Sequence, residues 1–187
     1  MKRITLAALL CWFSATAAAA ELAGVFVENQ VEAADGQILV LNGMGLREKF
    51  WVDVYVGSLY LTDKTADVAR ILSTPGPWRV QLDFVYKEVS RNKLLDAWRD
   101  GFEGNQSAET LAALKDRIDR FYSLFDSSAI AGDEYAFDYF PGTGVTVSRN
   151  GKTLGTIEGD DFKTALLEIW LGNEPADKQL KKGMLGL

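Results

Sequence analysis

Hydrophobic residues recur along the chain at spacings that distinguish strands from helices. Residues 80–86 alternate between apolar and polar, and this period of two predicts an antiparallel strand with one face in water. Residues 38–41 and 51–61 form nearly continuous apolar runs, and the longer run predicts a central strand with both faces buried. Pro75-Gly76-Pro77 separates this central strand from the alternating one.

The middle of the chain follows a helical spacing instead. Ser90 and Ser107 each precede a segment with an apolar stripe, so each serine is predicted to cap a helix. A further helix is predicted from Asp160, which we expect to act as its cap, to Gly172, which we expect to end it. The three stripes contain Leu94, Leu95, Trp98 and Phe102; Leu111, Leu114, Ile118, Phe121 and Phe125; and Phe162, Ala165, Leu166, Ile169 and Trp170.

Strand patterns return near the carboxyl end, at residues 135–140, 145–148 and 153–157. Asn150-Gly151 between the last two is a strong indicator of a two-residue hairpin. The order of elements is therefore strands, one minor helix, a strand, two helices, three strands and a helix. Runs of strands and runs of helices favour an α+β fold with an antiparallel sheet covered by helices on one face.

The first twenty residues are typical of a secretory signal peptide. Lys2 and Arg3 precede a short apolar run over residues 4–13, and Ala18-Ala19-Ala20 provides a small-residue cleavage site. The alternative is a membrane anchor, but the apolar run is well short of the roughly 20 residues that a spanning helix needs. We expect cleavage between Ala20 and Glu21 and a periplasmic or secreted mature protein, with no transmembrane segment after processing.

Charge and cysteine content narrow the range of functions. Removing 20 of the 187 residues leaves 167, a length typical of one domain, residues 21–187. Loss of Lys2 and Arg3 moves the formal net charge from −6 to −8, which argues against nucleic acid as a partner. The only cysteine, Cys11, leaves with the signal peptide, so the mature chain has neither disulfide nor thiol chemistry.

The chain has no histidine, which excludes Ser–His triads and nearly all zinc sites, and we expect no cofactor and no metal. Asp160-Asp161 is a possible metal-binding pair, but acidic residues are favoured at a helix start, so capping is the preferred interpretation. The glycine-rich residues 142–144 lie between two strands and predict a hairpin loop instead of a phosphate site. Asp133-Glu134 is interpreted as the solvated start of a strand.

Arginine, tyrosine and lysine around an apolar interior remain available. Such side chains suit the binding of an anion, a carboxylate or an enolate against an apolar wall. Arg47 precedes the longest apolar strand run. Composition alone favours a solvated hairpin end for Arg47 over a binding role.

Three blocks in this order resemble the chalcone isomerase-like family. The first is LNGMGLREKFWVDVYVGSLYL at residues 41–61, where the family has a Gly-x-Gly-x-Arg turn leading into a strand that ends in Gly-x-x-Tyr. The second is FVYKEVSRNKLLDAW at residues 84–98, where the family has a strand running into a helix. The third, DDFKTALLEIWLGNEP at residues 160–175, is similar to the family's late helix. The resemblance implies an open-faced β-sandwich, with a large antiparallel sheet, covering helices and a ligand cleft.

The resemblance also implies one of two activities. Plant chalcone isomerases cyclise a chalcone with the help of an arginine, a threonine and tyrosines, whereas a second branch binds fatty acids through an arginine and a tyrosine. Arg47 matches the shared arginine, and Tyr55 falls where the enzyme has threonine and the binders have tyrosine. Tyr86 lies near the second tyrosine of the enzyme. Ile169 and Trp170 replace a hydroxyl residue and a methionine of the enzyme.

These departures favour a non-catalytic binder of a small hydrophobic acid, such as a fatty acid, because the polar partners of a polyphenol are lost. The expected ligand-binding residues are Arg47, Tyr55, Tyr86, Ile169 and Trp170. The alternatives are an intramolecular lyase or isomerase, with Arg47, Tyr55 and Tyr86 as its catalytic residues, and a periplasmic protein-interaction module. An apolar cleft filled by its own side chains would favour the interaction module.

The sequence alone leaves one geometric difficulty. Along one straight strand, Arg47 and Tyr55 would be about 26 Å apart, at about 3.3 Å per residue. They can bind one ligand only if the chain folds back at residues 50–52, where no Gly, Asn or Pro indicates a turn. We therefore expect a short, tight hairpin at this point.

Overall fold

A computed structural model describes residues 19–187 of the chain. The predicted signal peptide lies outside the described residues except for Ala19 and Ala20, which begin strand β1. The strands are β1 (Ala19–Leu22), β2 (Val25–Glu28), β3 (Gln30–Glu32), β4 (Ile38–Lys49), β5 (Val52–Leu61), β6 (Trp78–Phe84), β7 (Glu88–Val89), β8 (Ala129–Ile130), β9 (Glu134–Phe140), β10 (Gly144–Arg149) and β11 (Lys152–Ile157). The helices are α1 (Val68–Ser73), α2 (Arg91–Asn105), α3 (Ala108–Ser123), α4 (Asp160–Leu171) and α5 (Lys178–Met184).

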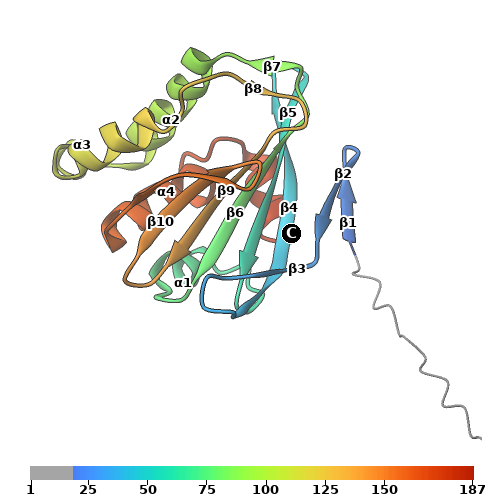
Figure 1. The fold of residues 1–187 in the computed structure, drawn as a ribbon, viewed down its shortest axis with the longest axis horizontal. Coiled ribbons are helices and arrows are strands. Elements are labelled where there is room, and N and C mark those ends of the chain that lie inside the picture. The colour runs from blue at the N-terminus through green and yellow to red at the C-terminus, as the bar shows by residue number, and fades with distance from the viewer. Residues whose placement is uncertain (1–18) are drawn as a thin grey trace, which may run out of the picture.

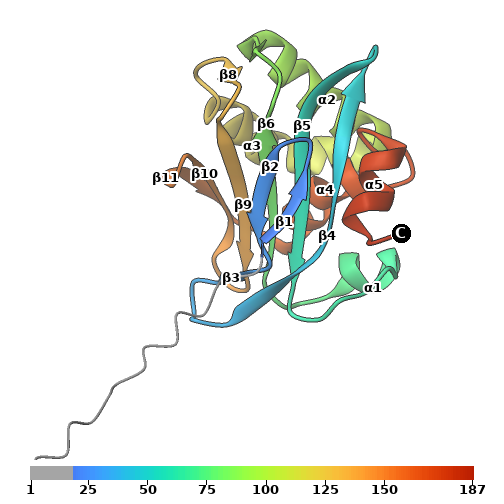
Figure 2. The same ribbon diagram turned by 90° about the vertical axis from the view of Figure 1, so that its right-hand side faces the viewer.

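One antiparallel sheet of seven strands forms the centre of the fold, in the order β11-β10-β9-β6-β5-β4-β3. Helices α2, α3 and α4 cover one face, and the β1–β2 hairpin lies over the other (Figures 1 and 2). Helix α5 packs along β4 (Figure 2). The predicted α+β, open-faced architecture and order of elements are confirmed.

The alternating pattern of β6 determines which of its residues enter the core. Trp78, Val80, Leu82 and Phe84 are each at most 3% exposed and face the helices. Tyr86 was expected to continue the strand, but β6 ends at Phe84. The chain bends there because the N–H groups of residues 85 and 86 both donate to the carbonyl oxygen of Val54, which leaves Tyr86 42% exposed.

Gly43 and Gly45 lie within β4, so the expected turn at this Gly-x-Gly block is wrong. Their lack of a side chain allows helix α5 to approach the strand backbone. A Cβ at Gly43 would lie 2.2 Å from the carbonyl oxygen of Gly183, and one at Gly45 would lie 2.6 Å from the carbonyl oxygen of Leu180. The two glycines therefore seat α5 against the strand that carries Arg47.

The helix boundaries agree with two of the three predicted caps. Ser90 accepts a hydrogen bond from the backbone of α2, and Ser107 accepts one from the backbone of α3. Asp160 does not cap α4, because Gly159 is the cap residue and Asp160 is already helical. The Asp160 carboxylate instead accepts a 2.7 Å hydrogen bond from the hydroxyl of Tyr139. The expected end of α4 at Gly172 is confirmed.

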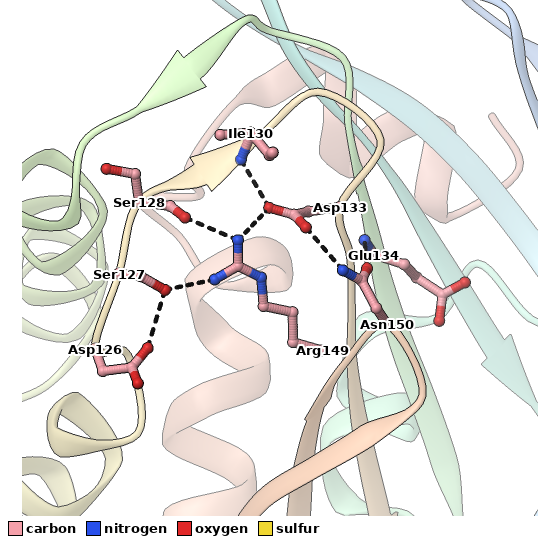
Figure 3. A network of polar contacts seen from close by, with 8 residues as sticks. All are labelled: Asp126, Ser127, Ser128, Ile130, Asp133, Glu134, Arg149 and Asn150. Carbon is pink, nitrogen blue, oxygen red and sulfur yellow. Dashed lines mark hydrogen bonds and ion pairs between the residues drawn. The ribbon is translucent and has the colours of Figure 1, made fainter.

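Asp133 is buried, at 5% exposure, so its interpretation as a solvated residue is wrong. Its carboxylate accepts hydrogen bonds from Arg149, from the side chain of Asn150 and from the N–H of Ile130 (Figure 3). Burial raises the pKa of Asp133, but these hydrogen bonds outweigh it and hold the pKa below the ordinary value. The carboxylate is therefore satisfied in its buried position.

The Asp133 network also fixes the segment that follows α3. Arg149 donates to the hydroxyl of Ser127 at 2.6 Å and to the carbonyl oxygen of Ser128 at 2.9 Å (Figure 3). These contacts hold the chain leading into β8, which pairs with β7. Strand β7 in turn provides one wall of the candidate site described below.

Asp83 has an unfavourable environment on the sheet face opposite the helices. Burial is the largest cause that raises its pKa, to about 6, and the cross-strand neighbour Glu134 also raises it. A folded-state pKa above the ordinary value of 3.8 means that the stability which Asp83 contributes is fully present below about pH 4 and is lost as pH rises through about 6.

We therefore expect Asp83→Asn to stabilise the protein by about 1–2 kcal/mol at pH 8 and to have little effect at pH 4. This range is below the full value of about 1.4 kcal/mol per pKa unit because Asp83 is partly solvated. Thermal unfolding of both proteins at the two pH values measures the difference. An equal shift in Tm at pH 4 and pH 8 would contradict the prediction.

Candidate functional site

The β4–β5 hairpin brings Arg47 and Tyr55 together. The two strands are joined by Phe50 and Trp51 alone, and Arg47 lies directly opposite Tyr55 in the strand register. The guanidinium carbon of Arg47 lies 5.4 Å from the centroid of the Tyr55 ring. The tight fold-back expected at residues 50–52 is confirmed, and it removes the geometric difficulty.

Tyr55 is oriented by the late helix α4. Its side chain is 3% exposed, and its hydroxyl oxygen accepts a 3.2 Å hydrogen bond from the indole N–H of Trp170. Burial raises the pKa of Tyr55 and outweighs the lowering effects of Arg47 and Trp170, so the hydroxyl is protonated at neutral pH. Within residues 19–187 this O–H has no acceptor, and it is available to donate to a ligand.

A small cavity of about 20 Å³ lies next to this pair. The Nε of Arg47 and the indole nitrogen of Trp98 are buried without a hydrogen-bond partner in the described part of the chain. The cavity is lined by Arg47, Val54, Tyr55, Phe84, Val89, Leu94, Ala97, Trp98, Ile169 and Ala176. It has room for a group about the size of one water molecule. Apart from Arg47, Tyr55 and Trp98, the residues that line it are apolar.

A wider groove of about 370 Å³ lies beside the small cavity, between the β4–β5 hairpin, β7 and α2. Arg47, Val54, Val89 and Ala97 line both spaces, so the groove and the cavity are adjacent. The remaining lining residues are Lys49, Phe50, Val52, Tyr86, Glu88, Lys93, Asp96 and Asp100. The groove volume lies in the range of small-molecule sites, about 300–1,000 Å³.

The structure brings together most of the residues predicted from the sequence. Arg47, Tyr55 and Ile169 line the cavity, and Tyr86 lines the groove. Trp170 lines neither space, and its indole N–H instead donates a hydrogen bond to the Tyr55 hydroxyl.

Trp98 was not predicted as a site residue. It lies on the apolar stripe of α2 and packs edge-on against Phe121, Phe137 and Trp170, so the helical pattern identifies it only as a core residue. Its buried indole N–H without an acceptor is visible only in three dimensions.

These groups are suited to holding an oxygen acceptor. Arg47, Tyr55 and Trp98 all offer N–H or O–H donors beside the cavity, and a buried donor without a partner costs about 1–3 kcal/mol. Residues 19–187 contain no group of side chains arranged to hold a metal ion. In the same described segment, no helix is both long and apolar enough to cross a bilayer.

The fold is similar to that of a known ligand-binding protein. The crystal structure of the fatty-acid binding protein AtFAP1 from Arabidopsis thaliana superposes with a TM-score of 0.71 at 16% sequence identity. The alignment covers 90% of this chain and 96% of the Arabidopsis chain. No curated protein sequence matches the chain.

The sequence profile described as chalcone isomerase-like matches residues 19–186. This match spans all three of the blocks quoted above and nearly all of the residues that form the sheet, its helices and the candidate site. The chain therefore belongs to the chalcone isomerase-like family.

Proposed function

We propose that the protein binds a small hydrophobic acid, such as a medium- or long-chain fatty acid, without converting it. The observation that carries this proposal is the pair of buried, unpaired donors on Arg47 and Trp98, both of which line the small cavity beside the groove. The similarity in fold to the Arabidopsis fatty-acid binding protein supports it. A carboxylate is the acceptor that an arginine fork binds best.

The two spaces differ in what they can hold. The cavity of about 20 Å³ takes a carboxylate oxygen but no alkyl chain. The alkyl chain of the ligand lies instead along the groove, against Val52, Val54 and Val89. Because the protein's own side chains leave only this small cavity next to Arg47 and Tyr55, only the polar end of the ligand can enter it. By itself, the nearly filled cavity would favour a protein-interaction module, but the open groove of about 370 Å³ beside it favours ligand binding.

The proposal is tested by identifying what the protein carries. Protein purified from its native host under non-denaturing conditions is extracted with organic solvent, and the extract is examined by mass spectrometry. We expect the extract of the wild-type protein to contain a monocarboxylic amphiphile in an amount comparable to that of the protein. The extract of Arg47→Ala should lack this compound. An extract dominated by neutral lipids or phenols would contradict the proposal.

Cyclisation of a chalcone requires a base or a proton relay near the reacting oxygen. Burial raises the pKa of Tyr55, so its hydroxyl is protonated at neutral pH and is not available as a base, and Trp170 already donates to its oxygen. We expect no chalcone cyclisation above the spontaneous rate, followed as loss of chalcone absorbance. A rate that saturates with substrate and disappears in Arg47→Ala would favour the enzyme instead.

We also propose that the protein is exported and processed between Ala20 and Glu21. The basic start, short apolar run and small-residue exit support this proposal. Amino-terminal sequencing of protein from the native host should begin at Glu21, in the periplasm or the medium. A start at Met1 would remove the assignment of compartment.

A further inference from the structure

Phe50 and Trp51 form the end of the β4–β5 hairpin and project into solvent. Phe50 is 86% exposed and Trp51 is 100% exposed, whereas large aromatic side chains are ordinarily buried. Their backbone conformation is also disfavoured, because both have positive φ angles, of 52° and 66°. The chain thus holds two bulky aromatic residues where neither the solvent nor the backbone favours them.

A second hairpin in the same sheet shows that this turn does not require aromatic residues. Asn150 and Gly151 join β10 to β11 with φ angles of 51° and 75°, close to the values at Phe50 and Trp51. Asn-Gly is the sequence that this turn type prefers. The reversal of the chain therefore does not account for aromatic residues at positions 50 and 51.

Other exposed apolar residues gather at the same end of the molecule. Val52 begins β5, Tyr86 lies beside Val54 through a backbone hydrogen bond, and Ile130 is on β8. Strand β8 pairs with β7, which lines the groove together with the β4–β5 hairpin, and Figures 1 and 2 both show β8 at the same end of the molecule as this hairpin. Of the eight exposed large hydrophobic residues within 19–187, five lie here: Phe50, Trp51, Val52, Tyr86 and Ile130. We call these five residues the apolar tip.

We infer that the apolar tip docks on a lipid bilayer, with Phe50 and Trp51 inserted among the lipid headgroups. A specific protein partner would cover about 20–30 residues on each side, whereas the exposed apolar residues gathered at this tip number five. A bilayer needs no complementary shape, and tryptophan and tyrosine favour its interface. The neighbouring Glu48 and Lys49 offset each other in charge, so a zwitterionic bilayer suits this surface.

Docking would place the binding groove at the membrane surface. Phe50, Val52 and Tyr86 belong to the apolar tip and also line the groove that contains Arg47. An apolar ligand could then pass between the bilayer and the groove without crossing water. This consequence rests on the proposed function, but the docking itself does not, because it requires only the exposed residues.

Phosphatidylcholine vesicles with brominated acyl chains test the inference, because bromine quenches tryptophan fluorescence at short range. Within the described residues Trp51 is 100% exposed, whereas Trp78, Trp98 and Trp170 are at most 4% exposed. We expect brominated vesicles to quench the protein more than unbrominated ones. The difference should be lost in the double variant Phe50→Asn/Trp51→Gly, whose Asn-Gly turn preserves folding.

Vesicle sedimentation provides a second readout that does not depend on Trp51. The double variant should bind vesicles about tenfold more weakly or worse, since two aromatic side chains no longer leave water. The matched control is Phe26→Ser, which removes a 68% exposed aromatic residue from the β1–β2 hairpin and should leave binding unchanged.

The inference is overturned if wild-type protein shows no bromine-dependent quenching, or if the double variant sediments with vesicles as wild type does. It is equally overturned if the wild-type protein forms a dimer that the double variant does not, with no vesicle binding. If the protein binds vesicles through the apolar tip but carries no acid, the docking inference is supported and only the proposed function is contradicted.

Discussion

Replacing Arg47 with alanine is expected to weaken the binding of a fatty acid by roughly 30–150-fold. A charge-assisted hydrogen bond to a partly buried guanidinium contributes about 2–3 kcal/mol, and about 1.4 kcal/mol corresponds to a factor of ten. Arg47 has no salt bridge within residues 19–187, so it has no internal carboxylate to give up on binding. Calorimetric titration of wild type and variant with the same acid measures the difference.

Two comparisons separate a carboxylate anchor from a general loss of packing. Arg47→Lys should recover only part of the affinity, because lysine keeps the charge but loses the planar fork. The methyl ester should bind wild type and Arg47→Ala about equally, since it carries no anionic group. Lys49→Ala, an exposed cation on the same strand and the same groove, is the matched control and should cost less than about fivefold. Equal binding of the acid to wild type and Arg47→Ala would mean that Arg47 is only a hairpin residue.

Replacing Gly45 with alanine is expected to destabilise the protein by about 3 kcal/mol or more. The new Cβ would lie 2.6 Å from the carbonyl oxygen and 2.8 Å from the Cα of Leu180. Both atoms belong to the backbone of α5, so the helix must move away from β4 to make room. Overpacking of this kind costs about 1–3 kcal/mol and more when backbone cannot yield. Equilibrium unfolding in urea measures the free energy.

A helical glycine with room for a methyl group provides the control with the opposite sign. Gly104 lies in the last turn of α2, and its nearest neighbour to a new Cβ would be the Cβ of Glu174, at an ordinary 3.5 Å. Gly104→Ala should therefore stabilise the protein by about 0.5–1 kcal/mol through helix propensity. If Gly45→Ala instead changed the free energy of unfolding by less than about 0.5 kcal/mol, α5 would not be seated as described.

The periodic parts of the chain could be predicted from the sequence because burial acts on them directly. The alternation in β6 and the stripes of α2, α3 and α4 each correspond to a buried face in the structure. Arg47 and Tyr55 were assigned to one site through the family resemblance, and the hairpin register then placed them opposite each other.

The features that could not be predicted depend on contacts between distant segments. The turn at Phe50-Trp51 contains no turn-forming residue, so it was expected only from the need to bring Arg47 and Tyr55 together, and the positive φ angles of its two aromatic residues were not predicted. In the sequence Asp133 cannot be told from an exposed acid, because its partners Arg149 and Asn150 come from the end of β10 and the turn after it. Trp98 belongs equally to the core and to the cavity, and only its unpaired indole N–H distinguishes the second role.

The most direct test of carboxylate anchoring is the ionisation of the bound acid itself. A fatty acid labelled with ¹³C at its carboxyl carbon is titrated by NMR in complex with the protein, since its chemical shift reports ionisation. If Arg47 holds the carboxylate, the pKa of the bound acid lies at least one unit below the ordinary carboxyl value of about 4.3, and Arg47→Ala raises it to that value or above. A bound carboxyl group that titrates at the same pH in wild type and Arg47→Ala would contradict the account.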